Sequence, residues 1–213
     1  MSTLSKGDII KNVNDAYCFA SNCAPLEIRK ALLNDPLSGE KEVYLLGLRG
    51  TDSTYDVKSP LSIPTCFKSF AAKENPYTRL VKKEMLEKIP AGAYVVFIGH
   101  SLGGMVSQQV GADKQIKERY KILHILTMGS PWVIQKNKPV SFHRMADHSD
   151  IIPHLFCSGL FLSYFFGNVT HEYAGYFGHP VKSHCDSYEK CPLWQKYDCF
   201  GVKYGGHTLT ALD

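Results

Sequence analysis

The chain has 213 residues, of which 44% are hydrophobic, so it can bury one sizeable core, and we expect a single domain over residues 1–213. Its 24 basic and 20 acidic residues leave a formal net charge of +4. This balance is far short of the clustered positive field of nucleic-acid-binding proteins. We therefore expect no nucleic acid among its partners.

The beginning of the chain and its longest apolar run bear on location. Residues 1–12 are polar and include Lys6, Asp8 and Lys11, where a secretory signal needs an uninterrupted apolar stretch. Residues 155–167 are apolar but are interrupted by serines and are too short to cross a bilayer as a helix. We expect a cytoplasmic protein with no signal peptide and no transmembrane segment.

Cysteine usage agrees with that expectation. Seven cysteines cannot all pair within one chain, and in the cytosol we expect them to be mainly reduced thiols. They are Cys18, Cys23, Cys66, Cys157, Cys185, Cys191 and Cys199. His184 together with the last three lacks the paired C-x-x-C spacing that is typical of a zinc site, so we expect no metal.

Strand and helix patterns alternate along the chain. Short apolar runs rich in β-forming residues are typical of strands covered on both faces. They occupy residues 42–48, 93–98, 122–128 and 140–145. Residues 77–89 carry apolar side chains at helical spacing, and a second helix is expected over residues 105–110. The alternation predicts an α/β fold with a central, mostly parallel sheet and flanking helices.

One motif on this framework carries chemistry. Residues 99–104 read GHSLGG and lie between a predicted strand and a predicted helix. In a G-x-S-x-G turn the serine occupies a strained corner, and the glycines remove side chains that would collide there. The start of the helix directs backbone N–H groups toward any developing negative charge. The motif therefore predicts that Ser101 is a nucleophile.

Three blocks of the sequence resemble the class 3 lipases, over about residues 16–207. Besides GHSLGG, residues 46–53 (LGLRGTDS) look like the FRG[ST]xS signature of that family, and residues 127–131 (TMGSP) look like its TFGxPRVG strand end. Leu48 stands where the family usually has phenylalanine, and Trp132 where it usually has arginine. The resemblance implies an α/β-hydrolase fold and a serine ester hydrolase.

The nucleophile needs a carboxylate and a histidine, which follow it in the order acid and then base in α/β-hydrolases. Asp150 lies in residues 149–155 (SDIIPHL), which resemble the DxVPxLP segment of the family, and we expect it to be the acid. Asp147 is the alternative, although it lies outside the matching segment and fits a solvated loop or a turn cap.

The choice of base is harder because several histidines follow Asp150. They are His154, His171, His179, His184 and His207. We predict His207 as the base, because it follows two glycines and resembles the late histidine that leads into a terminal helix in the family. His154 is too near the acid in sequence and His171 fits a structural role. His179 and His184 remain the fallback candidates.

The oxyanion hole is expected to combine two donors. One is the backbone N–H of Leu102, directly after the nucleophile. The other donor, which the resemblance implies, is Thr51. The alternative is that Thr51 and Asp52 only form a turn after the strand. With these fixed donors the mechanism needs no cofactor.

The substrate is expected to be a lipid or other acyl ester. Residues 52–65 are few and contain two prolines, which discourages a long lid helix and favours an esterase, a monoacylglycerol lipase or a phospholipase-like enzyme. Residues 155–166 are expected to line an acyl pocket, to touch a membrane surface transiently, or simply to pack in the core. Two alternative functions stay open: a binding or signalling protein with a vestigial triad, and an acyltransferase or thioesterase.

Overall fold

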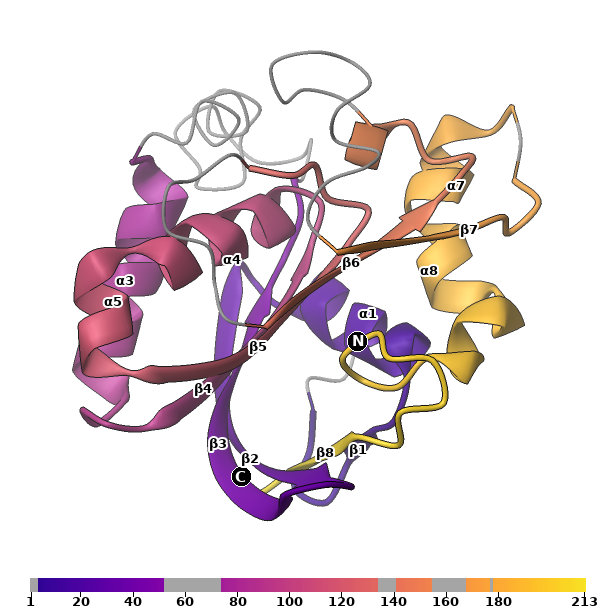
Figure 1. Cartoon of the computed structure of the whole chain (residues 1–213). Coiled ribbons are helices and arrows are strands. Elements are labelled where there is room, and N and C mark those ends of the chain that lie inside the picture. The colour runs from indigo at the N-terminus through magenta and orange to yellow at the C-terminus, as the bar shows by residue number, and fades with distance from the viewer. Residues whose placement is uncertain (1–3, 52–73, 134–140, 155–167, 177) are drawn as a thin grey trace.

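The computed structural model describes residues 4–51, 74–133, 141–154, 168–176 and 178–213, and its centre is an eight-stranded sheet in the order β1-β8-β2-β3-β4-β5-β6-β7 (Figure 1). The strands are β1 (Ile9–Ile10), β2 (Leu26–Asp35), β3 (Gly39–Leu48), β4 (Tyr94–His100), β5 (Lys121–Met128), β6 (Phe142–Asp147), β7 (Val169–Glu172) and β8 (Thr208–Ala211). The strands from β3 to β7 run parallel to one another, whereas β1, β8 and β2 pair in antiparallel fashion at the other edge. The predicted mostly parallel sheet with flanking helices is confirmed.

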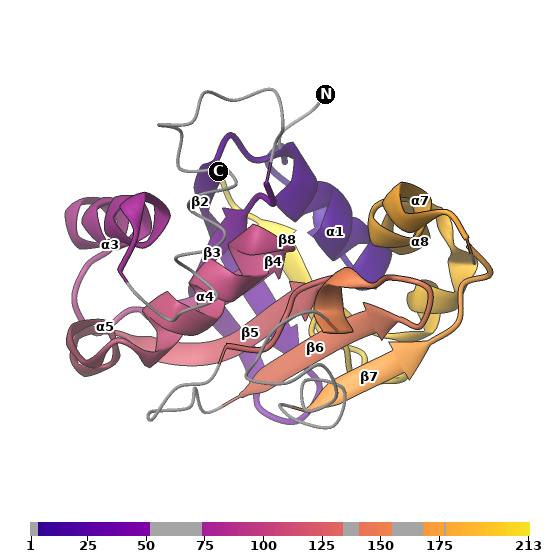
Figure 2. The ribbon, with the colours of Figure 1, turned by 90° about the horizontal axis from the view of Figure 1, so that it is seen from above.

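Two groups of helices cover opposite faces of this sheet (Figure 2). The first group is α3 (Pro76–Lys88), α4 (Leu102–Ala112) and α5 (Lys114–Arg119). The second group is α1 (Val13–Asn22), α7 (Pro180–His184) and α8 (Asp186–Lys190), followed by the 3-10 turn η2 (Pro192–Lys196). A further 3-10 turn, η1 (Ile152–His154), follows β6.

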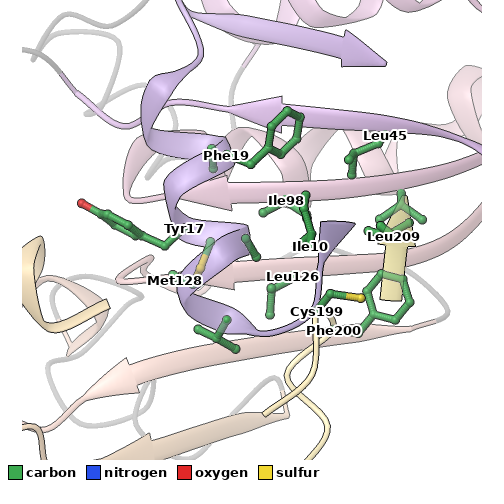
Figure 3. Packing of buried hydrophobic residues seen from close by; sticks show 14 of the residues in the cluster. Ile10, Tyr17, Phe19, Leu45, Ile98, Leu126, Met128, Cys199, Phe200 and Leu209 are labelled. Atoms are coloured by element: carbon green, nitrogen blue, oxygen red, sulfur yellow. The ribbon is translucent and has the colours of Figure 1, made fainter. Parts of the chain in front are cut away.

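The alternation of side chains along β4 explains why both faces are covered. Val95 and Phe97 join the cluster under α3, α4 and α5, whereas Val96 and Ile98 join the cluster under α1 and η2. All four side chains are completely buried. Figure 3 shows the second cluster, to which α1 contributes Tyr17 and Phe19 and β4 contributes Ile98. A strand buried on both faces must be apolar throughout, as the sequence predicted.

The strands and helices that the sequence indicated are present with small shifts in their ends. β3 begins three residues before the predicted start, and β6 covers Phe142–Asp147 instead of residues 140–145. The helix predicted at residues 77–89 is α3. Asn75 caps its start: the Asn75 side chain accepts from the backbone N–H of Tyr77 and of Thr78. Pro76 at the first helical position also favours this start.

The resemblance to lipases implies a terminal helix after His207, and this prediction is wrong. Residues 208–211 form β8, which lies between β1 and β2 and pairs with both. The threonines at 208 and 210 are half-buried, and Leu209 and Ala211 are buried, the alternation of a strand with one face against the core. Residues 208–211 therefore form an inner strand of the antiparallel part of the sheet.

The described residues contain no helix that is long and apolar enough to cross a membrane. Their five cysteines, Cys18, Cys23, Cys185, Cys191 and Cys199, all carry free thiols. Cys66 and Cys157 lie outside the described residues, so the expectation about them stays a prediction.

Candidate active site

Ser101 occupies the sharp turn between β4 and α4 that its motif predicted. Its backbone has φ 52° and ψ −120°, a left-handed φ that residues other than glycine rarely adopt. The backbone N–H of Ser101 donates to the carbonyl of Met128 at 3.0 Å, which ties the turn to the end of β5. The strained corner is held by the strands around it, as a nucleophile turn requires.

The glycines of the motif are required by close approach of the backbone. A Cβ on Gly103 would lie 2.2 Å from the carbonyl oxygen of Leu48, and one on Gly99 would lie 2.7 Å from the carbonyl of Gly103. These neighbours are backbone atoms, which cannot move aside as a flexible side chain can. The turn, the first helical turn of α4 and the end of β3 therefore pack without any room for side chains.

Gly103→Ala is expected to destabilise the protein by about 3 kcal/mol, the upper part of the range for overpacking, because the new methyl group must displace the backbone of β3. Urea unfolding followed by circular dichroism measures this. Gly111→Ala in the same helix is the matched control. Its new methyl group would overlap chiefly the flexible end of Ile125, and alanine favours a helix, so its free energy of unfolding should change by less than about 1 kcal/mol. Equal effects of the two substitutions would contradict this account of the turn.

Asp150, the predicted acid, is completely buried in the loop after β6. A buried carboxylate is costly unless it is hydrogen-bonded. Its Oδ1 accepts from the backbone N–H of Ile152 at 3.0 Å, and its Oδ2 accepts from the Tyr188 hydroxyl at 3.0 Å. Nδ1 of His184 lies 2.9 Å from Oδ2 and 3.1 Å from Oδ1. Asp150 is thus the orienting carboxylate of a histidine.

That histidine is His184 and not the predicted His207, so the expected pairing of His207 with Asp150 is wrong. Nδ1 of His207 lies 2.5 Å from Oδ2 of Asp198, and its Nε2 lies 3.7 Å from Oδ1 of Asp35, at the end of β2. Asp198 also accepts from the backbone N–H of His207 at 3.1 Å. The two glycines before His207 therefore do not carry its ring to Ser101, because Asp198 holds the ring beside β2.

His184 reaches Asp150 because α7 is short and lies beside the carboxyl ends of β6 and β7 (Figure 1). The helix begins at Pro180 and ends at His184, so its last turn carries the ring to the acid loop. His179, the other fallback candidate, is exposed and stands just before this helix. Nothing in the sequence around His184 distinguishes it from His179 before the helix is folded.

His184 is also brought to the neighbourhood of Ser101. The centroid of the His100 ring, directly before Ser101 in the chain, lies 4.6 Å from the centroid of the His184 ring. Nε2 of His100 lies 3.0 Å from the carbonyl oxygen of His184, close enough to donate to it. A Cβ on Gly129, the residue after Met128, would lie 2.9 Å from Asp150 and 3.1 Å from the His184 ring.

Among the described residues, no hydrogen bond joins the Ser101 hydroxyl to the His184 ring. Hydrogen bonds between a nucleophile and its base are often long in the free enzyme and shorten when substrate binds.

The electrostatic environment keeps His100 neutral. Burial lowers the pKa of His100 well below its ordinary value, and the nearby His184 lowers it further. The neutral ring can still donate one hydrogen bond, and the carbonyl of His184 is the acceptor in reach. His100 therefore supports the backbone of His184 without adding a positive charge beside it.

Asp147, the alternative acid, has other partners. Its Oδ1 accepts from the backbone N–H of Ser149 at 2.8 Å, and its Oδ2 accepts from the Ser187 hydroxyl at 2.5 Å. Two of the remaining histidines contact each other: the rings of His154 and His171 stack with centroids 5.4 Å apart. Burial, followed by the neighbouring His171, lowers the pKa of His154 to about 4.

The two expected oxyanion donors come from different elements. Leu102 is the first residue of α4, where the backbone N–H groups have no acceptor within the helix. Thr51 follows β3 and is exposed, and a Cβ on the preceding Gly50 would lie only 2.9 Å from Cβ of Ser101. The segment that carries Thr51 therefore passes directly beside Ser101.

Several expectations concern residues that lie outside the part of the chain that the structure describes. The short lid segment, residues 52–65, and the apolar segment, residues 155–166, lie outside the described residues. In the described ranges, no group of three or more His, Cys, Asp or Glu side chains is arranged to hold a metal ion.

Comparison with protein families gives a match to part of the chain. A family model described as a PGAP1-like alpha/beta domain matches residues 77–146, about a third of the chain. The matched stretch runs from α3 into β6 and includes Ser101 but neither Asp150 nor His184. This family is of the α/β-hydrolase type, which agrees with the sheet and helices described above, and the match does not single out the class 3 lipases. No curated protein and no solved structure matches the chain significantly.

Proposed function

We propose that the protein is a serine carboxylic-ester hydrolase in which Ser101 is the nucleophile, His184 the base and Asp150 the acid. The observation that carries the proposal is the contact of His184 with the buried Asp150, beside the strained turn of Ser101. The φ of 52° at Ser101 costs free energy, and such strain is concentrated at functional sites, which supports the proposal together with the contact of His184 and Asp150.

The chemistry follows from these positions. Nε2 of His184 takes the proton of the Ser101 hydroxyl as the oxygen attacks the ester carbonyl, and a tetrahedral oxyanion forms. Asp150 holds Nδ1 of His184 and stabilises the imidazolium. The N–H groups of Leu102 and Thr51 are proposed to stabilise the oxyanion. The imidazolium then gives its proton to the departing alcohol, and water, activated by the same histidine, releases the acid from Ser101.

Lipid acyl esters are the proposed substrate class. Apolar side chains are exposed next to the acid and on the helix of the base: Ile151 is 55% exposed and Val181 is 75% exposed. Tyr173, directly after β7, is 55% exposed. Apolar side chains grouped around an esterase site favour contact with an acyl chain or a lipid surface. The proposed partners are therefore a lipid-like ester and, transiently, a membrane surface.

A fluorophosphonate probe tests the proposal, because it reacts with a serine hydroxyl only when a base has activated it. We expect the wild-type protein to gain one adduct, located by peptide mass spectrometry on Ser101, and the His184→Ala variant to react far more slowly. Absence of labelling in the folded wild-type protein would favour a binding protein with a vestigial triad.

A panel of esters then separates the enzyme classes. Monoacylglycerols, phospholipid vesicles, short soluble esters and acyl thioesters are compared side by side with the same preparation. Faster turnover as the acyl chain lengthens would support a lipid substrate. Preference for a thioester, or transfer to an added alcohol in place of water, would favour a thioesterase or an acyltransferase.

A further inference from the structure

We infer that Tyr188 is a positioning residue of the triad: its hydroxyl fixes the Asp150 carboxylate and tunes the basicity of His184, an inference that rests on the proposed function. Tyr188 is completely buried on α8. Its hydroxyl lies 2.9 Å from the backbone nitrogen of Asp147 and 3.0 Å from Oδ2 of Asp150. No sequence pattern marks this residue.

The direction of both hydrogen bonds follows from the proton count. The backbone N–H of Asp147 can only donate, so the Tyr188 oxygen accepts there. The single phenolic proton is then free to be donated to Asp150. Burial and the adjacent Asp150 raise the pKa of Tyr188 well above its ordinary value, so the phenol keeps this proton at every pH at which an esterase works.

The phenol restricts the rotation of the carboxylate. Oδ2 of Asp150 faces the Tyr188 hydroxyl and Nδ1 of His184, while Oδ1 accepts from the backbone N–H of Ile152. With a donor on each oxygen, the carboxylate has one preferred plane, and Oδ2 stays directed at the base. Without the phenol, Oδ2 would keep only the His184 ring, whose position it is meant to fix.

The ring of Tyr188 is itself held firmly. It stacks between Tyr17 of α1 and Trp194 of η2, with centroids 6.0 Å and 5.4 Å away. Its backbone carbonyl accepts from the side-chain amide of Asn14 at 2.8 Å. The neighbouring Ser187 donates to Asp147 at the end of β6, so α8 contacts both of these carboxylates, Asp147 and Asp150. Because α8 is held in place, the Tyr188 hydroxyl also holds the Asp150 carboxylate in place.

Donation from Tyr188 also spreads the negative charge of Asp150. Removing the donor leaves more of that charge to stabilise the protonated form of His184, so the pKa of His184 should rise. In Tyr188→Phe we expect kcat for a soluble ester to fall about tenfold to a hundredfold, the range for losing a hydrogen bond to a charged group, with KM little changed. The acidic limb of the kcat/KM profile should move to higher pH, which a purely structural role would not produce.

Tyr120→Phe is the matched control. Tyr120 is also buried, and its hydroxyl donates to the backbone carbonyl of Met85 at 2.8 Å on the other face of the sheet. This variant loses a buried phenol hydrogen bond of similar length. It should show a comparable change in urea unfolding but an unshifted pH profile and an unchanged kcat.

Nuclear magnetic resonance distinguishes a failure of this inference from a failure of the proposed function. The titration of His184 is recorded with isotope-labelled histidine in the Ser101→Ala background, where no turnover is needed. Tyr188→Phe should raise the titration midpoint, and 3-fluorotyrosine placed at position 188, a stronger donor than tyrosine, should lower it. Midpoints that stay the same in both folded proteins would overturn the role of Tyr188, whatever the activity of Ser101. If Tyr188→Phe does not fold, the direction of the fluorotyrosine shift decides.

Discussion

Ser101→Ala is expected to lower kcat for a soluble ester by roughly 10⁴- to 10⁶-fold, because no other group of the site can form the acyl-enzyme. Residual turnover should come from the oxyanion donors and from binding alone. The fold should persist, since the backbone N–H of Ser101 keeps its bond to Met128 and alanine tolerates the turn no worse than serine. Steady-state kinetics, with circular dichroism to establish folding, measures both.

Ser107→Ala provides the control for this substitution. Ser107 is a completely buried serine of the same helix, and its hydroxyl donates to the carbonyl of Gly103 at 2.8 Å. Its removal should leave kcat close to that of the wild type and cost only some stability. Wild-type turnover by the Ser101→Ala protein would refute the nucleophile and the proposed function with it.

The second large effect concerns the base. His184→Ala should approach the loss seen for Ser101→Ala, because the hydroxyl is a weak nucleophile without a proton acceptor. The double variant should lose little more than either single one, since residues that act as one unit are strongly non-additive. Kinetics of the three variants on one soluble ester gives this comparison directly.

His207→Ala is the decisive control, because the lipase resemblance singled out this residue. The structure pairs it with Asp198, which also accepts from the backbone N–H groups of Phe200 and Val202. Losing the ring should lower the free energy of unfolding by about 1–3 kcal/mol, the cost of removing one partner of a buried group, and leave kcat of the folded molecules near the wild-type value. A severe loss of turnover in folded His207→Ala beside a mild one in His184→Ala would reverse our assignment.

The contrast between these two histidines shows why the base could not be predicted. Both lie in short polar segments after Asp150, and a base needs only to arrive near the nucleophile, from any distance along the chain. His207 was favoured because it resembles the late histidine of the family and because two glycines precede it. The position of His207 is set by the antiparallel edge of the sheet. There β8 begins one residue after His207 and pairs with β2, which brings the His207 ring to Asp35 and Asp198.

The sequence by itself predicted the parallel core of the sheet, two of its covering helices, α3 and α4, and the turn that carries Ser101. Each of these depends on local order along the chain: apolar runs buried on both faces for β3, β4 and β5, helical spacing for α3, and glycines that a strand-to-helix turn requires around Ser101. Asp150 was predicted because residues 149–155 resemble a segment of the family, and it lies shortly after the end of β6, where parallel strands present their functional residues.

Only the tertiary structure decided which side chains surround that acid. His184 and Tyr188 lie 34 and 38 positions beyond Asp150, on two five-residue helices whose sequences show no periodicity of their own. These helices are held in place by α1 and η2 through buried contacts such as Asn14 to the Tyr188 carbonyl. A short helix has too few internal hydrogen bonds to be stable alone, so its position is set by packing that no local pattern in the chain encodes.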